Sequence, residues 1–200
     1  GLLRWRREHL SGILNGIDTH VWNPATDPAL PRRYEFAHLH GKGANRAALR
    51  ARFGLEDSPA VPLLGNVGRI THQKGLDLLA GIIDDIAALP AQLVLLGTGD
   101  RTIEASLLQA AARHPGRVAV DIGFDDGLAH LIEAGADMFL MPSRYEPCGL
   151  NQMYSLRYGT PPVVRATGGL ANTVIDAANA KHGNGFVFGP ATGKALLEAL

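Results

Sequence analysis

The sequence predicts an α/β domain built on a parallel β-sheet with helices on both faces. From about residue 61 onward, short apolar runs of strand length alternate with longer segments whose apolar residues recur at helical spacing. Such alternation is typical of a parallel sheet, because its crossover helices cover both faces. The hydrophobic share of 46% supplies enough apolar material for a sizeable core in a chain of 200 residues.

Six strands are expected after residue 60, at residues 61–67, 92–96, 117–122, 137–140, 162–165 and 185–188. Helices are expected at residues 75–89, 101–114, 126–134, 149–158 and 193–200, and after Gly169. Asp125 is placed to cap the helix that begins at residue 126. Gly97-Thr98-Gly99 lacks the third glycine of a dinucleotide-binding turn, since Thr102 stands at that position, so a plain strand-to-helix turn is favoured.

The first 58 residues follow a different pattern. Residues 1–10 are mixed and basic and are expected to be helical, residues 11–15 form a short apolar run that predicts a strand, and Asn15-Gly16 is a turn signal. Prolines within residues 18–35 favour irregular chain, and helical spacing returns over residues 41–53 with Gly54 as a natural stop. We therefore predict a linker and packing arm at residues 1–58 and a compact domain at residues 59–200. The abrupt start and the helical pattern at the last residues suggest a piece of a longer protein.

Charge and composition argue against several classes of function. Lys+Arg and Asp+Glu both number 19, so no global field favours nucleic acid or an acidic membrane surface. For the basic cluster at residues 4–7, a solvated helix face is favoured over a nucleic-acid patch. A single cysteine excludes an internal disulfide and suits a reducing compartment. No run approaches the roughly 20 apolar residues of a membrane span, and no secretory signal opens the chain, so we expect a cytoplasmic protein.

The turn between the expected strand 137–140 and the expected helix 149–158 carries a carboxylate, Glu146, and a thiol, Cys148. Ligands of open α/β sheets bind at the carboxyl ends of the strands, so Glu146 is placed where a ligand would lie. A helix-capping acid is the alternative for Glu146. Cys148 could be a nucleophile at a helix start, but no histidine is paired with it locally, so a structural or ligand-contacting thiol is favoured.

Two cations flank the loop after the first expected strand. Arg69 follows that strand, and Lys74 lies at the start of the next helix five residues later. Such a pair can straddle a diphosphate, with the guanidinium as a fork, the ammonium as a point charge and the helix N-terminus adding its dipole. Surface charge at the edge of a sheet is the alternative.

A glycine-rich turn follows the expected strand 162–165. Thr167-Gly168-Gly169 can bring backbone N–H groups close to an anion, or it is an ordinary tight turn. The eight histidines show no metal-ligand spacing and no Asp-x-Asp occurs, so neither a metal nor a cofactor is expected.

Several stretches resemble one family. The turn S-R-x-E-P-C-G-L-x-Q at residues 143–152 resembles the sugar-binding loop of bacterial glycogen synthases and plant starch synthases. Residues 68–77, G-R-I-T-H-Q-K-G-L-D, resemble the phosphate-binding loop of that family, and residues 165–174 resemble its glycine-rich turn. Residues 12–18 and 22–24 match as well, so the motifs run in family order from about residue 11 to residue 188.

The resemblance implies the Rossmann-like, nucleotide-sugar-binding C-terminal domain of a GT-B glycosyltransferase. Members of the family transfer glucose from ADP-glucose to an α-1,4-glucan such as glycogen, with retention of configuration. The N-terminal half of such an enzyme, with its K-x-G-G-L loop and catalytic histidine, is not in this sequence. We therefore expect ADP-glucose or ADP, an α-1,4-glucan acceptor and an N-terminal domain of the same protein as partners. The chain alone is expected to fold and to bind ADP weakly, but to lack transferase activity.

The resemblance also implies roles for single residues. The catalytic roles fall on Arg69 and Lys74 at the diphosphate and on Glu146 at the glucose hydroxyls. Phe124 stands where the family has an aromatic, commonly tyrosine, that stacks on the adenine; a core phenylalanine is the alternative. The other expected substrate-binding residues are Asn15, Cys148, Gly149, Leu150, Thr167, Gly168 and Gly169. Tyr154 stands where many related retaining transferases carry a second glutamate, as in the starch-synthase branch.

Two other functions stay open from the sequence. One is a related transferase that uses a UDP-sugar, since Phe124 would stack on either base. The other is a non-catalytic module that binds sugar nucleotides or polysaccharide. Titration of ADP against UDP and glycogen would separate them.

Overall fold

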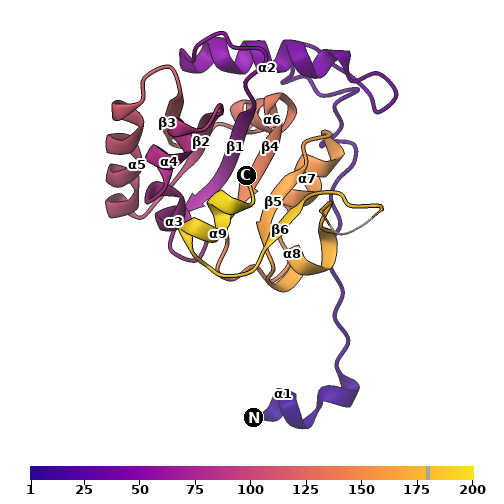
Figure 1. The fold of residues 1–200 in the computed structure, drawn as a ribbon. Helices are drawn as coiled ribbons and strands as arrows, with labels where there is room; N and C mark the ends of the chain where they lie inside the picture. Colours follow the sequence, from indigo (N-terminus) through magenta and orange to yellow (C-terminus); the bar gives the residue numbers. More distant parts are fainter. Residues whose placement is uncertain (179–180) are drawn as a thin grey trace.

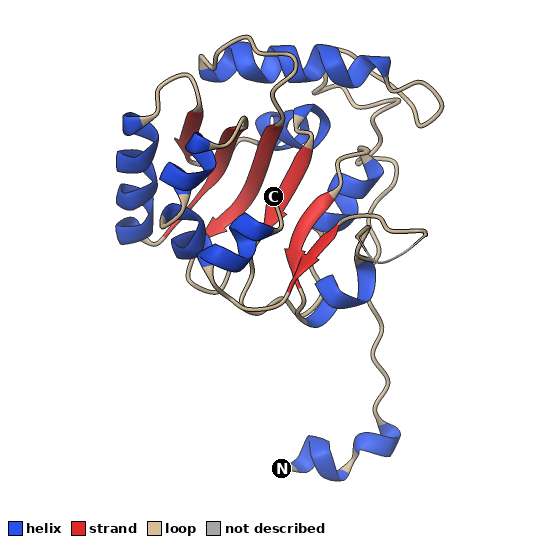
Figure 2. Ribbon diagram, viewed as in Figure 1, coloured by secondary structure: helices blue, strands red, loops and turns tan. Residues whose placement is uncertain are grey.

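The computed structural model describes residues 1–178 and 181–200, and its centre is a parallel β-sheet with helices on both sides (Figures 1 and 2). Six strands of the described chain form this sheet in the order β3-β2-β1-β4-β5-β6. Every neighbouring pair is parallel. The strands are β1 (Leu63–Ile70), β2 (Gln92–Gly99), β3 (Val118–Ile122), β4 (Met138–Met141), β5 (Pro162–Arg165) and β6 (Phe186–Phe188). The predicted fold class is thereby confirmed.

Helices connect the strands and cover both faces of the sheet. They are α1 (Leu2–Trp5), the 3₁₀ turn η1 (Arg7–His9), α2 (His40–Phe53), α3 (Leu76–Ala80), α4 (Ile83–Ala88), α5 (Arg101–Arg113), α6 (Asp126–Gly135), α7 (Asn151–Arg157), α8 (Gly168–Thr173) and α9 (Gly193–Glu198). Apolar residues of α3, α4, α5 and α9 form one core cluster with the sheet. Those of α2, α6 and α8 form a second cluster on the other face.

The strands divide their side chains between these two clusters. In β1, Leu64 belongs to the first cluster and Leu63 to the second. In β2, Leu93 and Leu95 alternate with Val94 and Leu96 in the same way. Because both faces are covered, the strands are continuous apolar runs rather than alternating ones, which is the pattern that identified them in the sequence.

Local signals in the sequence determine where several helices begin and end. The Asp125 side chain accepts a hydrogen bond from the Leu128 N–H at 2.9 Å and caps α6, as predicted. Asp100 caps α5 in the same manner, accepting from the N–H groups of Thr102 and Ile103. Gly54 ends α2 with a φ of 62°, a left-handed conformation that glycine adopts without steric cost.

The prediction of a strand at residues 11–15 is wrong. These residues have no strand conformation, and Figure 1 shows them in an extended segment that leads from α1 toward the sheet. An apolar run becomes a strand only when another strand pairs with it, and in the described chain none lies alongside. The helix expected over residues 1–10 is reduced to α1 and the turn η1.

Two other boundaries differ from the prediction. The helix expected over residues 75–89 is split into α3 and α4 at Gly81, a residue with low helix propensity. Gly97-Thr98-Gly99 is not a turn but the end of β2, where these residues pair with Gly68, Arg69 and Ile70. A Cβ atom at Gly97 would lie 2.0 Å from the Gly68 carbonyl oxygen, so only glycine permits this close approach of the two strands.

The part of the chain before β1 packs on the domain through buried side chains. Leu49 of α2 is fully buried, and the buried Arg50 side chain donates from Nε to Gln92 Oε1 at 2.7 Å. Trp22 stacks between His130 and Tyr154, with ring centroids 4.0 Å and 3.7 Å apart. The division of the chain at residue 59 stays a prediction. In the part of the chain that the structure describes, no helix is long and apolar enough to span a membrane.

We expect replacement of Leu49 by alanine to lower the free energy of unfolding by about 2–5 kcal/mol, because it leaves a cavity between α2, α6 and the sheet. Leu108→Ala on α5 is a matched control, since that side chain is 45% exposed, and its effect should stay within about 0.5 kcal/mol. Urea denaturation of both variants measures the difference. Equal effects would show that α2 is not part of the core.

Candidate functional site

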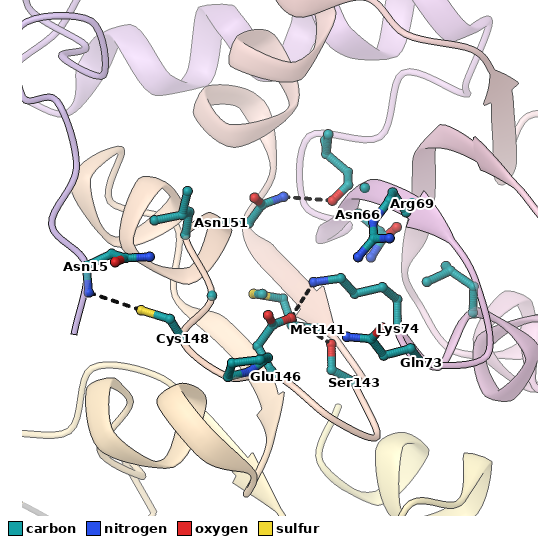
Figure 3. Close-up of a pocket in the computed structure, with 16 residues that line it drawn as sticks. Asn15, Asn66, Arg69, Gln73, Lys74, Met141, Ser143, Glu146, Cys148 and Asn151 are labelled. Carbon is teal, nitrogen blue, oxygen red and sulfur yellow. Dashed lines mark hydrogen bonds and ion pairs between the residues drawn. The ribbon is translucent and has the colours of Figure 1, made fainter. Parts of the chain in front are cut away.

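A cavity of about 520 Å³ opens at the carboxyl ends of β1 and β4. These strands are neighbours at the centre of the sheet, and the chain proceeds from them in opposite directions, to β2 and to β5. Such a switch point is where open α/β sheets bind ligands. The cavity wall contains residues of β1, the β1–α3 loop and the β4–α7 turn, together with Asn15 (Figure 3).

Lys74 and Glu146 form an ion pair inside this cavity. The Lys74 ammonium donates to Glu146 Oε2, which also accepts from Ser143 Oγ at 3.3 Å. Glu146 is 5% exposed, so its charge lies in a poorly solvated place and the ammonium neutralises it. Two of the three residues with expected catalytic roles are therefore in direct contact, and Figure 3 shows them pointing toward one another.

Arg69 lies at the end of β1 and lines the same cavity with an exposed side chain. In residues 1–178 and 181–200, no carboxylate forms an ion pair with Arg69. The cavity thus contains one cation paired with a carboxylate and a second that is available to an anion. This arrangement suits a ligand with both an anionic part and hydroxyl groups.

The β4–α7 turn is clamped onto the β1–α3 loop. The Arg144 guanidinium binds both carboxylate oxygens of Asp77, at 2.5 Å and 2.7 Å, and the carbonyl oxygen of His72 at 2.8 Å. Burial raises the pKa of Asp77, but the hydrogen bonds and charge of Arg144 outweigh burial and leave that pKa below its usual value. The arginine of the S-R-x-E sequence therefore holds the two loops together instead of facing the cavity.

The glycine-rich turn supports the Glu146 turn from the other side. The Gly169 N–H donates to the Glu146 carbonyl oxygen at 3.0 Å, so it is not free to bind an anion. A Cβ atom at Gly168 would lie 2.0 Å from that oxygen, and one at Gly169 would lie 2.0 Å from the Cys148 carbonyl oxygen. Thr167, Gly168 and Gly169 are absent from the cavity wall over the described residues, and their substrate-binding role stays a prediction.

Asn15 and the residues after Glu146 complete the cavity. The Asn15 N–H donates to Cys148 Sγ at 3.3 Å, which brings together residues 133 positions apart in the chain. Gly149 and Leu150 follow in the wall, with Gly149 at a φ of 76°. The expected substrate-binding residues Asn15, Cys148, Gly149 and Leu150 therefore share one cavity with the three charged residues.

A second cavity, of about 240 Å³, adjoins the first and contains Phe124. The two cavities share the wall residues Val67, Gly68, Arg69 and Asn151. The Phe124 side chain is 89% exposed, so the alternative of a core phenylalanine is wrong. An exposed aromatic face in the same cavity as Arg69 is suited to stack on a planar ring.

Sequence reasoning missed several polar residues of the cavity wall: Asn66, Gln73, Ser143 and Asn151. Gln73, Ser143 and Asn151 belong to the two motifs, but nothing in their spacing indicated which side chains face inward. Asn66 had a signal, since it is a single amide within the apolar run of β1. In the described ranges, no group of three histidine, cysteine or acidic side chains could hold a metal ion.

The chain is similar to known proteins of one family. The family model described as "Glycosyl transferases group 1" matches residues 49–200. Glycogen synthase 1 of Methylococcus capsulatus is 59% identical over all of this chain and 41% of its own length. The glycogen synthase of Dechloromonas aromatica is 57% identical over 98% of this chain and 41% of its own length. The chain thus spans about two fifths of the curated relatives that it matches.

Solved structures extend the comparison. The catalytic domain of starch synthase IV from Arabidopsis thaliana, bound to ADP and acarbose, superposes with a TM-score of 0.91 at 38% identity. That match covers 99% of this chain and 42% of the starch synthase. Anabaena Alr3699/HepE in complex with UDP-glucose superposes with a TM-score of 0.67 at 21% identity and covers 95% of this chain and 46% of its own, a likeness of fold alone.

We expect Gly169→Ala to displace the Glu146 turn, because the added methyl group has no space against the Cys148 backbone. Cys148 is the single cysteine, so the rate of its modification by a thiol reagent reports on this turn. The rate should rise several-fold and the melting temperature should fall. Gly189→Ala is the matched control, since a Cβ atom there meets nothing within 4 Å, and it should leave both unchanged. A Gly169 variant with wild-type reactivity and stability would contradict the clamped turn.

Proposed function

The chain belongs to the group 1 glycosyl transferases, and from this premise we propose that it is the donor-binding half of an enzyme that elongates α-1,4-glucan from ADP-glucose with retention of configuration. The observation that carries the proposal is the meeting of Arg69, Lys74 and Glu146 in one cavity at the switch point of the sheet. Relatives named glycogen synthase, at 57% and 59% identity, support the choice of reaction.

The two cations would bind the diphosphate of the donor. Arg69 supplies a forked donor without a protein carboxylate, and Lys74 supplies an ammonium held in place by Glu146. An ammonium has three N–H donors, so Lys74 can hold the carboxylate and a phosphate oxygen together. Charge that builds on the departing diphosphate is then met by groups already in position, which is the most effective form of electrostatic catalysis.

Glu146 would hold the glucose itself. Its Oε2 accepts from Lys74 and Ser143, and a carboxylate has further lone pairs for sugar hydroxyl groups. A lone carboxylate in this turn does not provide the second acid that glycoside-hydrolase chemistry needs. Binding and orientation of the sugar are therefore the role that we assign to Glu146.

Phe124 would stack on the base of the nucleotide. Its side chain is exposed and lines the second cavity, whose wall also contains Arg69. Arg69 belongs to the wall of the first cavity as well. Stacking does not separate adenine from uracil, so the preference for ADP rests on the relatives, among them the starch synthase bound to ADP. A UDP-sugar donor is the second candidate, favoured by this same tolerance of Phe124.

In the transfer itself, the bond between the anomeric carbon and the β-phosphate oxygen breaks and ADP departs. The acceptor hydroxyl oxygen of the glucan bonds to that carbon on the same face, and its proton passes to the departing phosphate. The acceptor and a catalytic histidine would be held by an N-terminal half that precedes residues 1–58. Residues 59–200 would form the nucleotide-sugar domain, and the free thiol of Cys148 is in keeping with a cytoplasmic location.

We expect Arg69→Ala and Lys74→Ala each to weaken ADP binding by about 1.5–3 kcal/mol, or roughly 10- to 150-fold, the range for hydrogen bonds to charged groups. Titration calorimetry with ADP measures the loss. Lys194→Ala is the matched control, because that side chain is 86% exposed on α9, and it should bind ADP as the wild type does. Unchanged affinity in the Arg69 variant would remove the diphosphate assignment.

Glu146→Gln in the full-length protein tests the proposed reaction. Turnover with ADP-glucose and glycogen should fall at least 100-fold, whereas ADP affinity should change less than about tenfold, because Glu146 faces the sugar. ADP release measures turnover, and UDP-glucose serves as the competing donor. A wild-type protein that prefers UDP-glucose would establish the second candidate. Equal losses of turnover and ADP affinity would assign Glu146 a structural role.

A further inference from the structure

Asn66 is the one polar side chain of β1 that the helices and strands bury almost completely, with 5% of its surface exposed. Its Nδ2 donates to the Leu140 carbonyl oxygen at 2.8 Å. Its Oδ1 is buried, and in the described part of the chain no donor bonds to it. A buried acceptor without a donor is unfavourable to folding, so its presence in a folded chain calls for an explanation.

The place of Asn66 in the sheet supplies part of that explanation. The register of β1 and β4 pairs Leu64 with Met138 and Gly65 with Phe139, and it ends there. Asn66 is the next residue, at the point where the two strands separate and the cavity begins. Its amide donates to the Leu140 carbonyl oxygen of β4, and the side chain is part of the cavity wall at the switch point.

The chemistry of the free oxygen narrows the choice of ligand group. An amide oxygen accepts a hydrogen bond from a hydroxyl or an N–H and does not attract a phosphate oxygen. Arg69 and Lys74 already provide for an anionic group in this cavity. Asn66 is not among the residues that line the second cavity, where Phe124 would stack on the base. Of the groups of a sugar nucleotide, the partner that suits this acceptor is therefore a neutral hydroxyl group bound in the cavity that also contains Glu146.

We propose that Asn66 Oδ1 accepts a hydrogen bond from a hydroxyl of the donor's sugar, and that Asn66 thereby favours the sugar nucleotide over the free nucleotide. This inference rests on the proposed function. Asn66 is itself part of the cavity wall, so a sugar bound in this cavity would lie against the side chain that carries Oδ1. A leucine here would join the apolar run around it, which makes the amide a feature of the site rather than of the core.

Calorimetric titration of the full-length protein with ADP-glucose and with ADP tests the inference. Asn66→Leu keeps the size of the side chain and removes the acceptor. Its affinity for ADP-glucose should fall roughly 3- to 10-fold, the loss expected for one neutral hydrogen bond, while ADP affinity stays within about twofold. Asn66→Asp keeps an acceptor and loses the donor to Leu140, so its ratio of ADP-glucose to ADP affinity should not drop below that of the wild type.

Monodeoxy analogues of ADP-glucose identify the hydroxyl. One of them should bind the wild type 3- to 10-fold more weakly and yet bind Asn66→Leu as ADP-glucose does. Should Asn66→Leu fail to fold, a lowered affinity ratio in Asn66→Asp would overturn the inference by itself. Equal loss of both ligands, or loss of neither, in Asn66→Leu would also overturn it. A wild-type protein that binds neither ligand would instead overturn the proposed function and this inference together.

Discussion

The arrangement of the site depends on a turn that is packed between two stretches of backbone at distances that exclude any side chain. On one side, a Cβ atom at Gly75 would lie 2.0 Å from the Pro142 carbonyl oxygen. On the other side, a Cβ atom at Gly168 would lie 2.0 Å from the Glu146 carbonyl oxygen, and one at Gly169 would lie 2.0 Å from the Cys148 carbonyl oxygen. Backbone that is confined from both sides has little freedom to move, so the side chain of Glu146 is presented in one position. Such preorganisation is what a binding or catalytic carboxylate requires.

An ion pair between the two loops explains why the Glu146 carboxylate can be buried. Glu146 is accepted there because the Lys74 ammonium reaches it from the opposite loop. Removal of one partner of a buried pair leaves an uncompensated charge and costs about 3–5 kcal/mol. The clamp of Arg144 on Asp77 keeps the two loops at the distance that this pair needs. The S-R-x-E turn therefore uses its arginine for support and its glutamate for the cavity.

The sequence was sufficient to predict the fold class because periodicity is a local property. The alternation of apolar runs and helical segments identified each strand of the sheet, and caps such as Asp125 and Gly54 marked helix ends. Pairing is not local, which is why the run at residues 11–15 was mistaken for a strand and the order of the strands was not predicted. A turn was expected at Gly97, but this residue belongs to β2, because the backbone at Gly68 of the neighbouring strand lies close to it. This approach could not be predicted from the sequence.

The site shows the same division. Arg69, Lys74 and Glu146 were found because residue type and motif spacing identify them, but their mutual contact came from the structure. From the sequence, the N–H groups of the Thr167-Gly168-Gly169 turn could approach an anion or belong to an ordinary tight turn, and the Gly169 N–H is bound to the Glu146 carbonyl oxygen. Asn66 lies outside every motif. Its one signal in the sequence is an amide within an apolar run, and the structure adds its burial and its unpaired oxygen. The motifs therefore identified the charged residues of the site. A neutral residue such as Asn66 was identified as a candidate only from the structure, because its burial and hydrogen bonds depend on the neighbouring strands.

The distribution of charge in the two cavities finally bears on which part of the reaction this chain contributes. Both cations and the aromatic face lie on the β1 and β3 side of the opening, and the carboxylate lies on the β4 side. On the proposed function, a donor would extend from Phe124 past Arg69 and Lys74 to Glu146 and Asn66, so that base, diphosphate and sugar each meet a different group. Groups of this chain would then be positioned to stabilise the departing ADP. On the proposed function, stabilisation of the leaving group is thus the step that these residues can perform.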